Sequence, residues 1–309
     1  MRIAFLGTPE FALPSLRMLA ENGHDIIVIT QPDKPKGRKQ LLCAPPVKAE
    51  ALKLDLPVLQ FDRIKNRDSV AELQKFTPDV MVTAAFGQIL SREILDIPKH
   101  GCINVHGSLL PKYRGAAPIQ SAIISGEEKT GITTMLTDIG LDTGDILLMR
   151  ELDIYPDETA GELSERLAVL GANVLRDTLD RLLRDELVAI PQDNLKATKC
   201  SRIGKENARI DFNRPAAEIH NLVRGMNPDP CAYAMIGSEP LNIWRTKLCE
   251  TWNQGANAGE CIIADPKKGL FIATANNLIE VTELQFRGAK RMNAKAALNG
   301  RNLKGCVLT

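Results

Sequence analysis

The amino-acid sequence predicts an α/β domain, with a doubly wound parallel sheet of the Rossmann-like kind, and a smaller, mostly β domain. The first domain is predicted by short apolar runs that alternate with helical patterns, as in a parallel sheet covered on both faces. The second is predicted by short β-rich runs near the end of the chain, separated by turn residues, as in a small barrel of the OB-like kind. With 309 residues, the chain can bury two such cores.

The elements of the first domain are predicted from the N-terminus onward. Arg2–Gly7 is an apolar strand, and Thr8 with Pro9 has the pattern of an N-cap and first-turn proline for a helix ending near Asn22. A loop rich in Pro, Lys and Gly covers residues 32–46, and a helix follows at 47–54. Further apolar strands are expected at residues 25–31, 57–61, 79–86, 101–105 and 132–138.

The second part of the chain begins with a long helical pattern at residues 159–185. An irregular stretch at 190–203 follows, and then a short helix at 214–225. The β-rich runs cover residues 233–236, 241–246, 259–263, 270–273 and 278–284. We therefore expect an α/β domain at residues 1–188, a linker at 189–204 and a β-barrel domain at 205–309.

Charge is distributed unevenly along a chain whose net charge is only +1. Residues 201–309 contain 15 Lys and Arg against 10 Asp and Glu, whereas residues 1–200 contain 24 against 28. This imbalance either indicates that the second domain meets an anionic partner or reflects chance variation among solvated charges. The seven cysteines are scattered without a Cys-x-x-Cys pair, which favours reduced thiols in a cytosol over a disulfide framework or a zinc site.

The turn after the first strand carries no phosphate-binding pattern. It reads Gly7-Thr8-Pro9-Glu10, not G-x-G-x-x-G, and no P-loop occurs elsewhere in the chain. Dinucleotide and nucleoside triphosphate binding therefore lose their main support from the sequence. The N-terminus has no signal-peptide pattern, and no apolar run is long enough to span a bilayer.

The stretch from Gly101 to Pro118 is the richest in polar side chains at a predicted strand end. Asn104 and His106 are two residues apart, so an extended strand places both side chains on one face. An amide donor beside an imidazole suits a carbonyl whose oxygen gains negative charge during a reaction. The same spacing also fits two polar groups that merely satisfy each other, so the pair by itself leaves both interpretations open.

An acidic loop adds a partner for this pair. Asp142 lies between Gly140 and Gly144, on a segment free to bend sharply. A carboxylate held near His106 is expected to raise the pKa of the imidazole and favour its charged form. Asp138 and Asp145 are rivals for this role, and an Asp-Thr-Gly turn without chemistry is the alternative.

Together these residues resemble the folate-dependent formyltransferase family, and within it the members that act on methionyl-initiator-tRNA. The resemblance rests on Asn104-x-His106, on Ser108-Leu109-Leu110-Pro111 and on Asp142-Thr143-Gly144. It extends over nearly the whole chain, through stretches at residues 7–12, 31–38, 103–120, 205–212 and 284–300.

The resemblance implies an activity and a set of site residues. The formyl group of 10-formyltetrahydrofolate would be transferred to the amine of methionyl-initiator-tRNA, without a metal. Asn104 and His106 would carry the oxyanion, and Asp142 would orient His106 and assist proton movement. Folate would be bordered by two segments, comprising Ser108, Leu109, Leu110, Pro111, Phe86, Gly87 and Ile89. Phe86 stands where the family usually has tyrosine.

The resemblance also implies where tRNA would bind. The loop at residues 33–48 is basic, and the segment at 290–292 gives the second domain a basic surface. The residues expected to contact tRNA are Lys36, Arg38, Lys39, Lys290 and Arg291. We further expect a cytoplasmic monomer with no membrane association.

Two other interpretations remain from the sequence alone. A relative with the same site could formylate a glycinamide nucleotide or an amino sugar nucleotide, or could hydrolyse the donor with water. The chain could also be an RNA-binding protein that has lost catalysis. The basic loop and the second domain favour tRNA as acceptor, and the intact Asn104, His106 and Asp142 argue against a loss of catalysis.

Overall fold

The computed structural model describes residues 1–36, 40–252 and 255–309, which divide into two compact units. Unit 1 comprises Met1–Gly115, Lys129–Asp153 and Ser164–Cys200. Unit 2 comprises Ala116–Glu128, Ile154–Leu163 and Ser201–Thr309.

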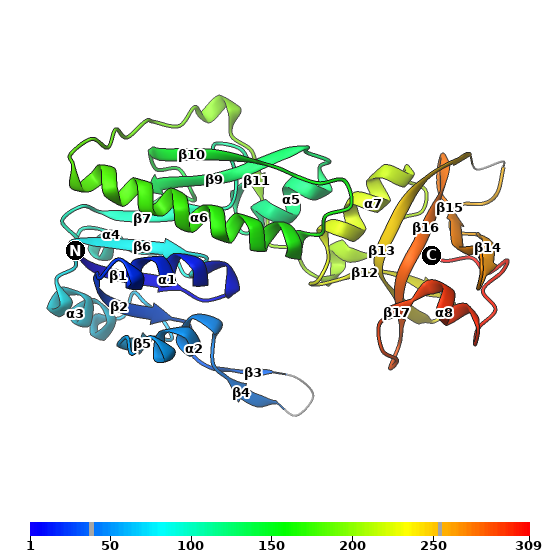
Figure 1. Cartoon of the computed structure of the whole chain (residues 1–309), viewed down its shortest axis with the longest axis horizontal. Helices are drawn as coiled ribbons and strands as arrows, with labels where there is room; N and C mark the ends of the chain where they lie inside the picture. Colours follow the sequence, from blue (N-terminus) through cyan, green and yellow to red (C-terminus); the bar gives the residue numbers. More distant parts are fainter. Residues whose placement is uncertain (37–39, 253–254) are drawn as a thin grey trace. The chain divides into compact units, whose positions relative to one another are not determined.

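In the described part of unit 1, the strands form a seven-stranded sheet in the order β10-β9-β7-β6-β1-β2-β5 (Figure 1). The chain builds from β1 to β5 and then returns to β6 on the other side of β1. The strand order therefore reverses between β1 and β6, and α/β sheets bind ligands beyond the carboxyl ends of their strands at such a reversal. The strands are β1 (Arg2–Gly7), β2 (Asp25–Thr30), β5 (Val58–Gln60), β6 (Val80–Ala84), β7 (Cys102–His106), β9 (Lys129–Leu136) and β10 (Ile146–Asp153).

One edge of this sheet is antiparallel. Strands β5, β2, β1, β6 and β7 are parallel, as predicted, but β9 pairs antiparallel with β7, and β10 pairs antiparallel with β9. The expected α/β class is confirmed, whereas the expectation of a wholly parallel sheet was wrong at this edge. The loop at residues 137–145 joins β9 to β10 directly, and parallel neighbours would have needed a crossover of a dozen or more residues.

Helices cover the two faces of the sheet. Ala4 and Leu6 of β1 pack with Val70 of α3 and Ile94 of α4 in one buried cluster. On the other face, the hydroxyl groups of Thr178 in α6 and Thr134 in β9 lie 2.8 Å apart. The helices are η1 (Glu10–Ala12), α1 (Leu13–Glu21), α2 (Pro46–Lys53), α3 (Arg67–Phe76), α4 (Arg92–Leu95) and α6 (Ala160–Leu183), whose first turn belongs to unit 2.

Two local expectations were wrong. Thr8 does not cap a helix: its hydroxyl donates to the Phe86 carbonyl at 3.0 Å, and a 3-10 turn precedes α1. The loop expected at residues 32–46 instead contains an antiparallel hairpin of β3 (Lys34–Lys36) and β4 (Leu41–Cys43). These short strands were not predicted because a sequence rich in proline and lysine has the pattern of a turn.

Unit 2 is built on an antiparallel sheet in the order β12-β13-β16-β15-β14, with β17 paired to β16. This arrangement confirms the predicted β domain. Its strands are β12 (Ala232–Ile236), β13 (Glu239–Trp252), β14 (Cys261–Asp265), β15 (Gly269–Ala273), β16 (Asn277–Phe286) and β17 (Met292–Asn293). Its helices are α5 (Pro118–Ile124), η3 (Lys205–Ala208), α7 (Ala216–Gly225) and α8 (Ala294–Leu298).

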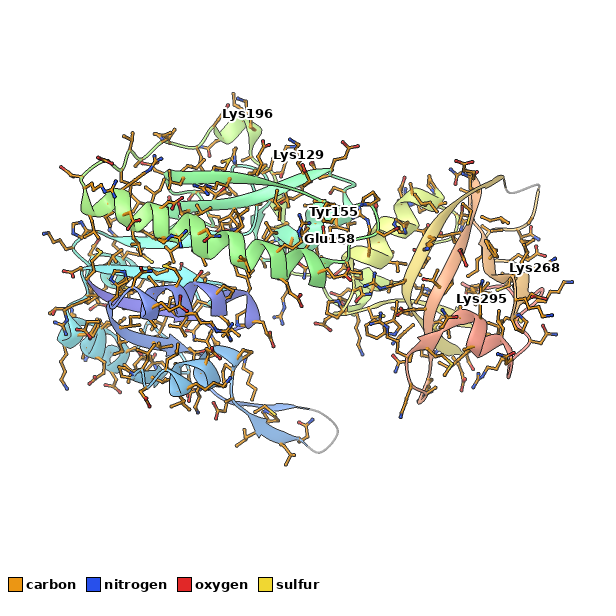
Figure 2. All side chains as sticks on the ribbon, viewed as in Figure 1. Lys129, Tyr155, Glu158, Lys196, Lys268 and Lys295 are labelled. Carbon is orange, nitrogen blue, oxygen red and sulfur yellow. The ribbon has the colours of Figure 1, made fainter. Side chains whose placement is uncertain are left out.

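Buried polar contacts explain why residues 154–163 belong to unit 2. His220 of α7 donates from Nε2 to the Pro156 carbonyl at 3.1 Å and accepts at Nδ1 from the Thr246 hydroxyl at 2.9 Å. Arg224 of α7, which is also buried, lies 3.4 Å from the backbone carbonyl of Glu158 (Figure 2 labels Glu158). These bonds hold the segment before α6 against α7 and β13.

The last residues of the chain join the two edges of the unit 2 sheet. Thr309 and Met235 of β12 exchange backbone hydrogen bonds of 2.7 and 3.0 Å. The Leu308 N–H donates to the Gly259 carbonyl at 2.8 Å, just before β14. Both edge strands are therefore paired through one segment, which closes the sheet in the manner of a barrel and leaves no free edge there.

We predict that Leu308→Ala lowers the free energy of unfolding of unit 2 by about 2–4 kcal/mol, because Leu308 is only 2% exposed within the core. Both tryptophans of the chain lie in unit 2, so denaturant unfolding followed by tryptophan fluorescence measures this unit. The neighbouring Val307 is 48% exposed, and Val307→Ala should cost less than about 1 kcal/mol. Equal losses in the two variants would contradict the closing role of Leu308.

Candidate active site

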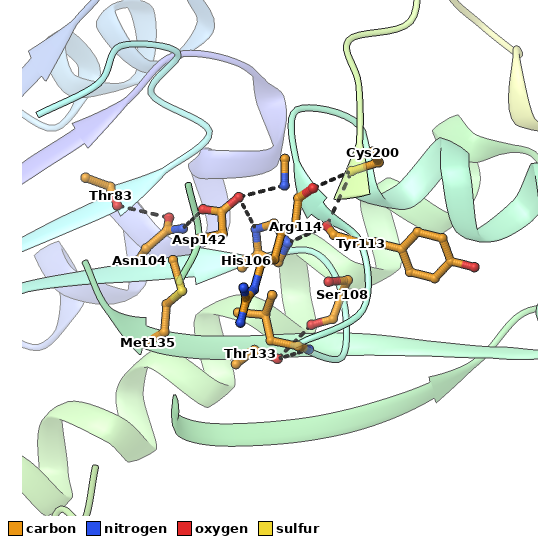
Figure 3. Close-up of polar contacts among 12 residues, drawn as sticks. Thr83, Asn104, His106, Ser108, Tyr113, Arg114, Thr133, Met135, Asp142 and Cys200 are labelled. Carbon is orange, nitrogen blue, oxygen red and sulfur yellow. Dashed lines mark hydrogen bonds and ion pairs between the residues drawn. The ribbon is translucent and has the colours of Figure 1, made fainter. Parts of the chain in front are cut away.

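The structure brings Asn104, His106 and Asp142 together at the carboxyl end of β7 (Figure 3). The Asp142 carboxylate lies 3.8 Å from Nδ1 of His106 and accepts from the Asn104 amide nitrogen at 3.5 Å. The side chains of His106 and Asp142 are 6% and 15% exposed. The group is thus largely shielded from water, where its electrostatic interactions are stronger than they would be at an open surface.

Asp142, not its rivals, occupies the position beside His106. Its backbone has a φ of 53°, in the left-handed region that Asp tolerates better than most residues. The Gly115 N–H donates to its carboxylate at 2.8 Å. Asp138 instead accepts from the Gly140 N–H at 3.0 Å and from the Thr143 hydroxyl at 2.7 Å, so Asp138 stabilises the turn that presents Asp142.

The orientation of the Asn104 amide is set by Thr83. The Thr83 hydroxyl, on the neighbouring strand β6, donates to Oδ1 of Asn104 at 3.0 Å. The amide nitrogen must then point toward Asp142 and the open end of the strand. Asn104 can therefore present an N–H donor to a ligand at this edge of the sheet.

The proton of neutral His106 is placed by a backbone carbonyl. Nε2 of His106 lies 3.0 Å from the Tyr113 oxygen, and because a carbonyl only accepts, the proton is on Nε2. Nδ1 is left with a lone pair that faces Asp142. Burial lowers the pKa of His106 below its usual value, although Asp142 and the Tyr113 carbonyl act to raise it. The carboxylate acts in the expected direction, but desolvation outweighs it, so the net shift of the His106 pKa is downward.

A short strand pairing supports the backbone that contacts His106 and Asp142. Strand β8 (Arg114–Gly115) pairs parallel with β11 (Lys199–Cys200). Gly115 has a φ of 126°, and a Cβ there would lie 2.1 Å from the Cys200 carbonyl oxygen. Only glycine lets the two backbones approach this closely, and the approach aims the Gly115 N–H at Asp142.

The two segments expected to border folate lie at the same edge of the sheet but expose different parts. Ser108 is buried, and its hydroxyl donates to the Lys112 carbonyl at 2.7 Å. The Phe86 ring is buried in the core, and its carbonyl accepts from the Gln31 amide at 3.1 Å. Ile89, by contrast, is 70% exposed. Leu110 is buried, Leu109 and Pro111 are half-buried, and Gly87 is exposed.

The basic residues expected to contact tRNA are found in both units. Arg38 and Lys39 lie outside the described residues, and Lys36 ends β3. In unit 2, Lys290 is exposed, whereas the Arg291 guanidinium pairs with the Glu283 carboxylate at 2.6 Å. The same guanidinium lies 4.7 Å from the centre of the Trp244 ring.

Sequence reasoning missed several residues that hold the candidate site in place. Thr83 and Gly115 carried no signal, since their roles depend on contacts between distant segments. Gln192, in the stretch expected to be an irregular linker, donates to the Asp142 carbonyl at 2.9 Å. Only the composition of residues 190–203 was informative, and it suggested a linker.

The described residues contain no group of three or more His, Cys, Asp or Glu side chains arranged to hold a metal ion. In the same described ranges, no helix has the length and apolar character needed to cross a membrane.

Two family models match successive parts of the chain. The model described as "Formyl transferase" matches residues 1–179, and the model described as "Formyl transferase, C-terminal domain" matches residues 202–302. The chain therefore belongs to the formyl transferase family.

Within that family, its sequence is similar to curated relatives named methionyl-tRNA formyltransferase. The relative from Ruminiclostridium cellulolyticum is 48% identical over 304 residues, which is 98% of this chain and 97% of the relative. The relative from Acetivibrio thermocellus is 46% identical over 97% of this chain and 96% of its own length. A crystal structure of a sugar 3N-formyl transferase, with dTDP and 5-N-formyl-THF, covers 94% of this chain and 99% of its own chain with a TM-score of 0.67. At 20% identity, that likeness concerns the fold alone.

We predict that Gly115→Ala reduces kcat for formyl transfer by at least about 100-fold, because the added Cβ displaces the N–H that anchors Asp142. Gly23→Ala is the matched control: Gly23 also has a positive φ, 68°, but a Cβ there meets no atom within 4 Å. That change should cost about 1 kcal/mol of stability and leave kcat unchanged. Comparable activity in the two variants would show that the Gly115 contact is dispensable.

We also predict that His106 titrates below the ordinary histidine value of about 6.5. As the pH falls, the buried ring stays neutral until its lowered pKa is reached. In Asp142→Asn the pKa should fall further, because the carboxylate that favours the imidazolium is removed. NMR titration of labelled histidines measures both values, with His106→Gln assigning the signal among the four histidines. A pKa at or above 6.5 would contradict the dominance of burial.

Proposed function

We propose that this chain transfers the formyl group of 10-formyltetrahydrofolate to the amino group of methionyl-initiator-tRNA. The observation that carries the proposal is the grouping of Asn104, His106 and Asp142 at the carboxyl end of β7. An oriented amide donor, a neutral imidazole and a carboxylate are the groups that acyl transfer to an amine requires. The near full-length similarity to relatives named methionyl-tRNA formyltransferase supports this acceptor.

In the proposed reaction, the uncharged amine attacks the formyl carbon and the carbonyl electrons move to its oxygen. The second N–H of the Asn104 amide stabilises this oxyanion, and one such donor contributes about 3 kcal/mol in other acyl-transfer enzymes. Neutral His106 takes the proton of the amine at Nδ1, and the Asp142 carboxylate stabilises the imidazolium. His106 then stabilises the oxyanion and returns the proton to N10 of the folate as the carbon–nitrogen bond breaks.

The donor is proposed to bind beside this group, along the carboxyl edge of the sheet. Residues 108–111 and the segment from Phe86 to Ile89 would border it, with the Ser108 backbone fixed by the Thr133 hydroxyl at 2.7 Å. Ile89 is 70% exposed and Leu141 is 58% exposed, so both side chains leave apolar surface uncovered. A flat pterin ring would cover such apolar surface.

The acceptor is proposed to contact the basic residues of both units. Lys36 ends β3, and Arg38 and Lys39 follow it in the sequence. Residues 205–309 would form the tRNA-binding domain that follows a catalytic domain at 1–188 and a linker at 189–204. Lys290 would offer its exposed ammonium to phosphates, whereas Arg291 would contact the RNA from its position over the Trp244 ring. We propose that the protein works in the cytoplasm as a monomer.

We predict that labelled 10-formyltetrahydrofolate transfers its label to methionyl-initiator-tRNA, measured by acid precipitation. Elongator methionyl-tRNA and a formyl-accepting sugar nucleotide serve as parallel acceptors. His106→Ala should abolish transfer to initiator tRNA, because among the described residues only His106 can accept a proton beside Asp142. Circular dichroism should show that the variant keeps its fold. Label on the sugar nucleotide, or release of free formate, would overturn the proposed acceptor while keeping a formyl-transfer site.

A further inference from the structure

Residues 192–200, here called the strap, contact the surroundings of the candidate site through Gln192, Thr198 and Cys200. Figure 1 shows the light green chain after α6 running outside β10 toward β11, and Lys196, labelled in Figure 2, lies on this strap. The Arg114 N–H donates to the Thr198 carbonyl at 2.9 Å, and the Tyr113 N–H donates to the Thr198 hydroxyl at 2.8 Å. The strap therefore holds the backbone that carries the carbonyl partner of His106.

Gln192 connects the strap to the turn that presents Asp142. Its Nε2 donates to the Asp142 carbonyl at 2.9 Å and to the Gly144 carbonyl at 2.7 Å. Its Oε1 accepts from Nε of Arg114 at 2.9 Å. One amide thus uses both of its N–H groups on carbonyls two residues apart, which restrains the turn on either side of Thr143.

The Arg114 guanidinium holds the Gln192 amide in place. Arg114 is buried, at 5% exposure, and its guanidinium also donates to the amide oxygen of Asn194 at 2.9 Å. Within the described ranges, no carboxylate forms an ion pair with this guanidinium. Two neutral amides solvate a buried charge only if both are held in place, so the arrangement resists movement of Gln192.

The dipeptide Arg114–Gly115 therefore contacts Asp142 by two routes. The Gly115 N–H binds the Asp142 carboxylate directly at 2.8 Å. The Arg114 side chain, through Gln192, holds the Asp142 backbone carbonyl. An aspartate whose carboxylate and backbone are both restrained loses little conformational freedom when substrates bind. This is the condition for electrostatic preorganisation.

We propose that Gln192 is a positioning residue for formyl transfer, which holds the Asp142 turn in its reactive geometry together with the buried Arg114. The strap is then part of the catalytic centre in addition to connecting two units. This inference rests on the catalytic role proposed above for Asp142. Without the Gln192 amide, the turn relaxes and the carboxylate leaves its place 3.8 Å from Nδ1 of His106.

The test uses the full chain with methionyl-initiator-tRNA and 10-formyltetrahydrofolate. Gln192→Met keeps the length of the side chain but removes the hydrogen bonds to Arg114, Asp142 and Gly144. Gln192→Glu keeps an acceptor for Arg114 while removing both donors. We expect each variant to lower kcat by about 10–100-fold, with KM for the donor changed by less than about threefold. Gln192→Met should also lower the pKa of His106, as Asp142→Asn does, because the carboxylate has moved away. NMR titration of the variant measures this shift.

A double-mutant cycle separates positioning from a general loss of structure. If Gln192 acts through Asp142, Gln192→Met should cause no further loss of kcat in the Asp142→Asn background. Leu195→Ala is the matched strap control, because Leu195 is 98% exposed, and it should leave kcat and the pKa of His106 unchanged.

Two results would overturn the inference, and a third would overturn its basis. Gln192→Met with kcat within threefold of the unmodified protein would show that the amide is not needed. Losses that simply add in the double variant would place the effect of Gln192 elsewhere. Near-normal activity of Asp142→Asn alone would instead remove Asp142 from the proposed mechanism, whatever the Gln192 variants do.

Discussion

The hydrogen bond from the Gly115 N–H to the Asp142 carboxylate is the contact on which the rest of this site depends. It exists because Gly115, with a φ of 126°, lies so close to Cys200 that any Cβ would overlap the Cys200 backbone. The bond fixes the carboxylate, which in turn faces His106 and accepts from Asn104. Three segments distant in sequence thereby form one polar group at the end of β7.

Burial decides how that group can act. A carboxylate beside an imidazole would by itself favour the imidazolium, but His106 is nearly inaccessible and its pKa is lowered. The ring is therefore neutral before reaction, with its proton donated to the Tyr113 carbonyl and its lone pair toward Asp142. The site is arranged to receive a proton and to stabilise the resulting charge, as attack by an amine would require.

Several elements were predictable because their signals are local. The apolar runs at Arg2–Gly7 and residues 79–86 became the adjacent central strands β1 and β6, and the turn-separated runs after residue 230 became the β sheet of unit 2. The direction of β9 was not predictable, since a buried strand has the same apolar pattern whether its neighbours are parallel or antiparallel. The hairpin of β3 and β4 was missed because its strands are short and rich in proline and lysine.

The sequence by itself determined the α/β and β units, the family, and the pairing of Asn104 with His106, because these signals are local and a strand places alternate residues on one face. Tertiary structure alone decided which aspartate faces His106, the lowered pKa of its ring, and the part that Gly115 and Gln192 have in holding Asp142. Those properties depend on burial and on hydrogen bonds between segments far apart in the chain, and neither can be predicted from the local order of residues.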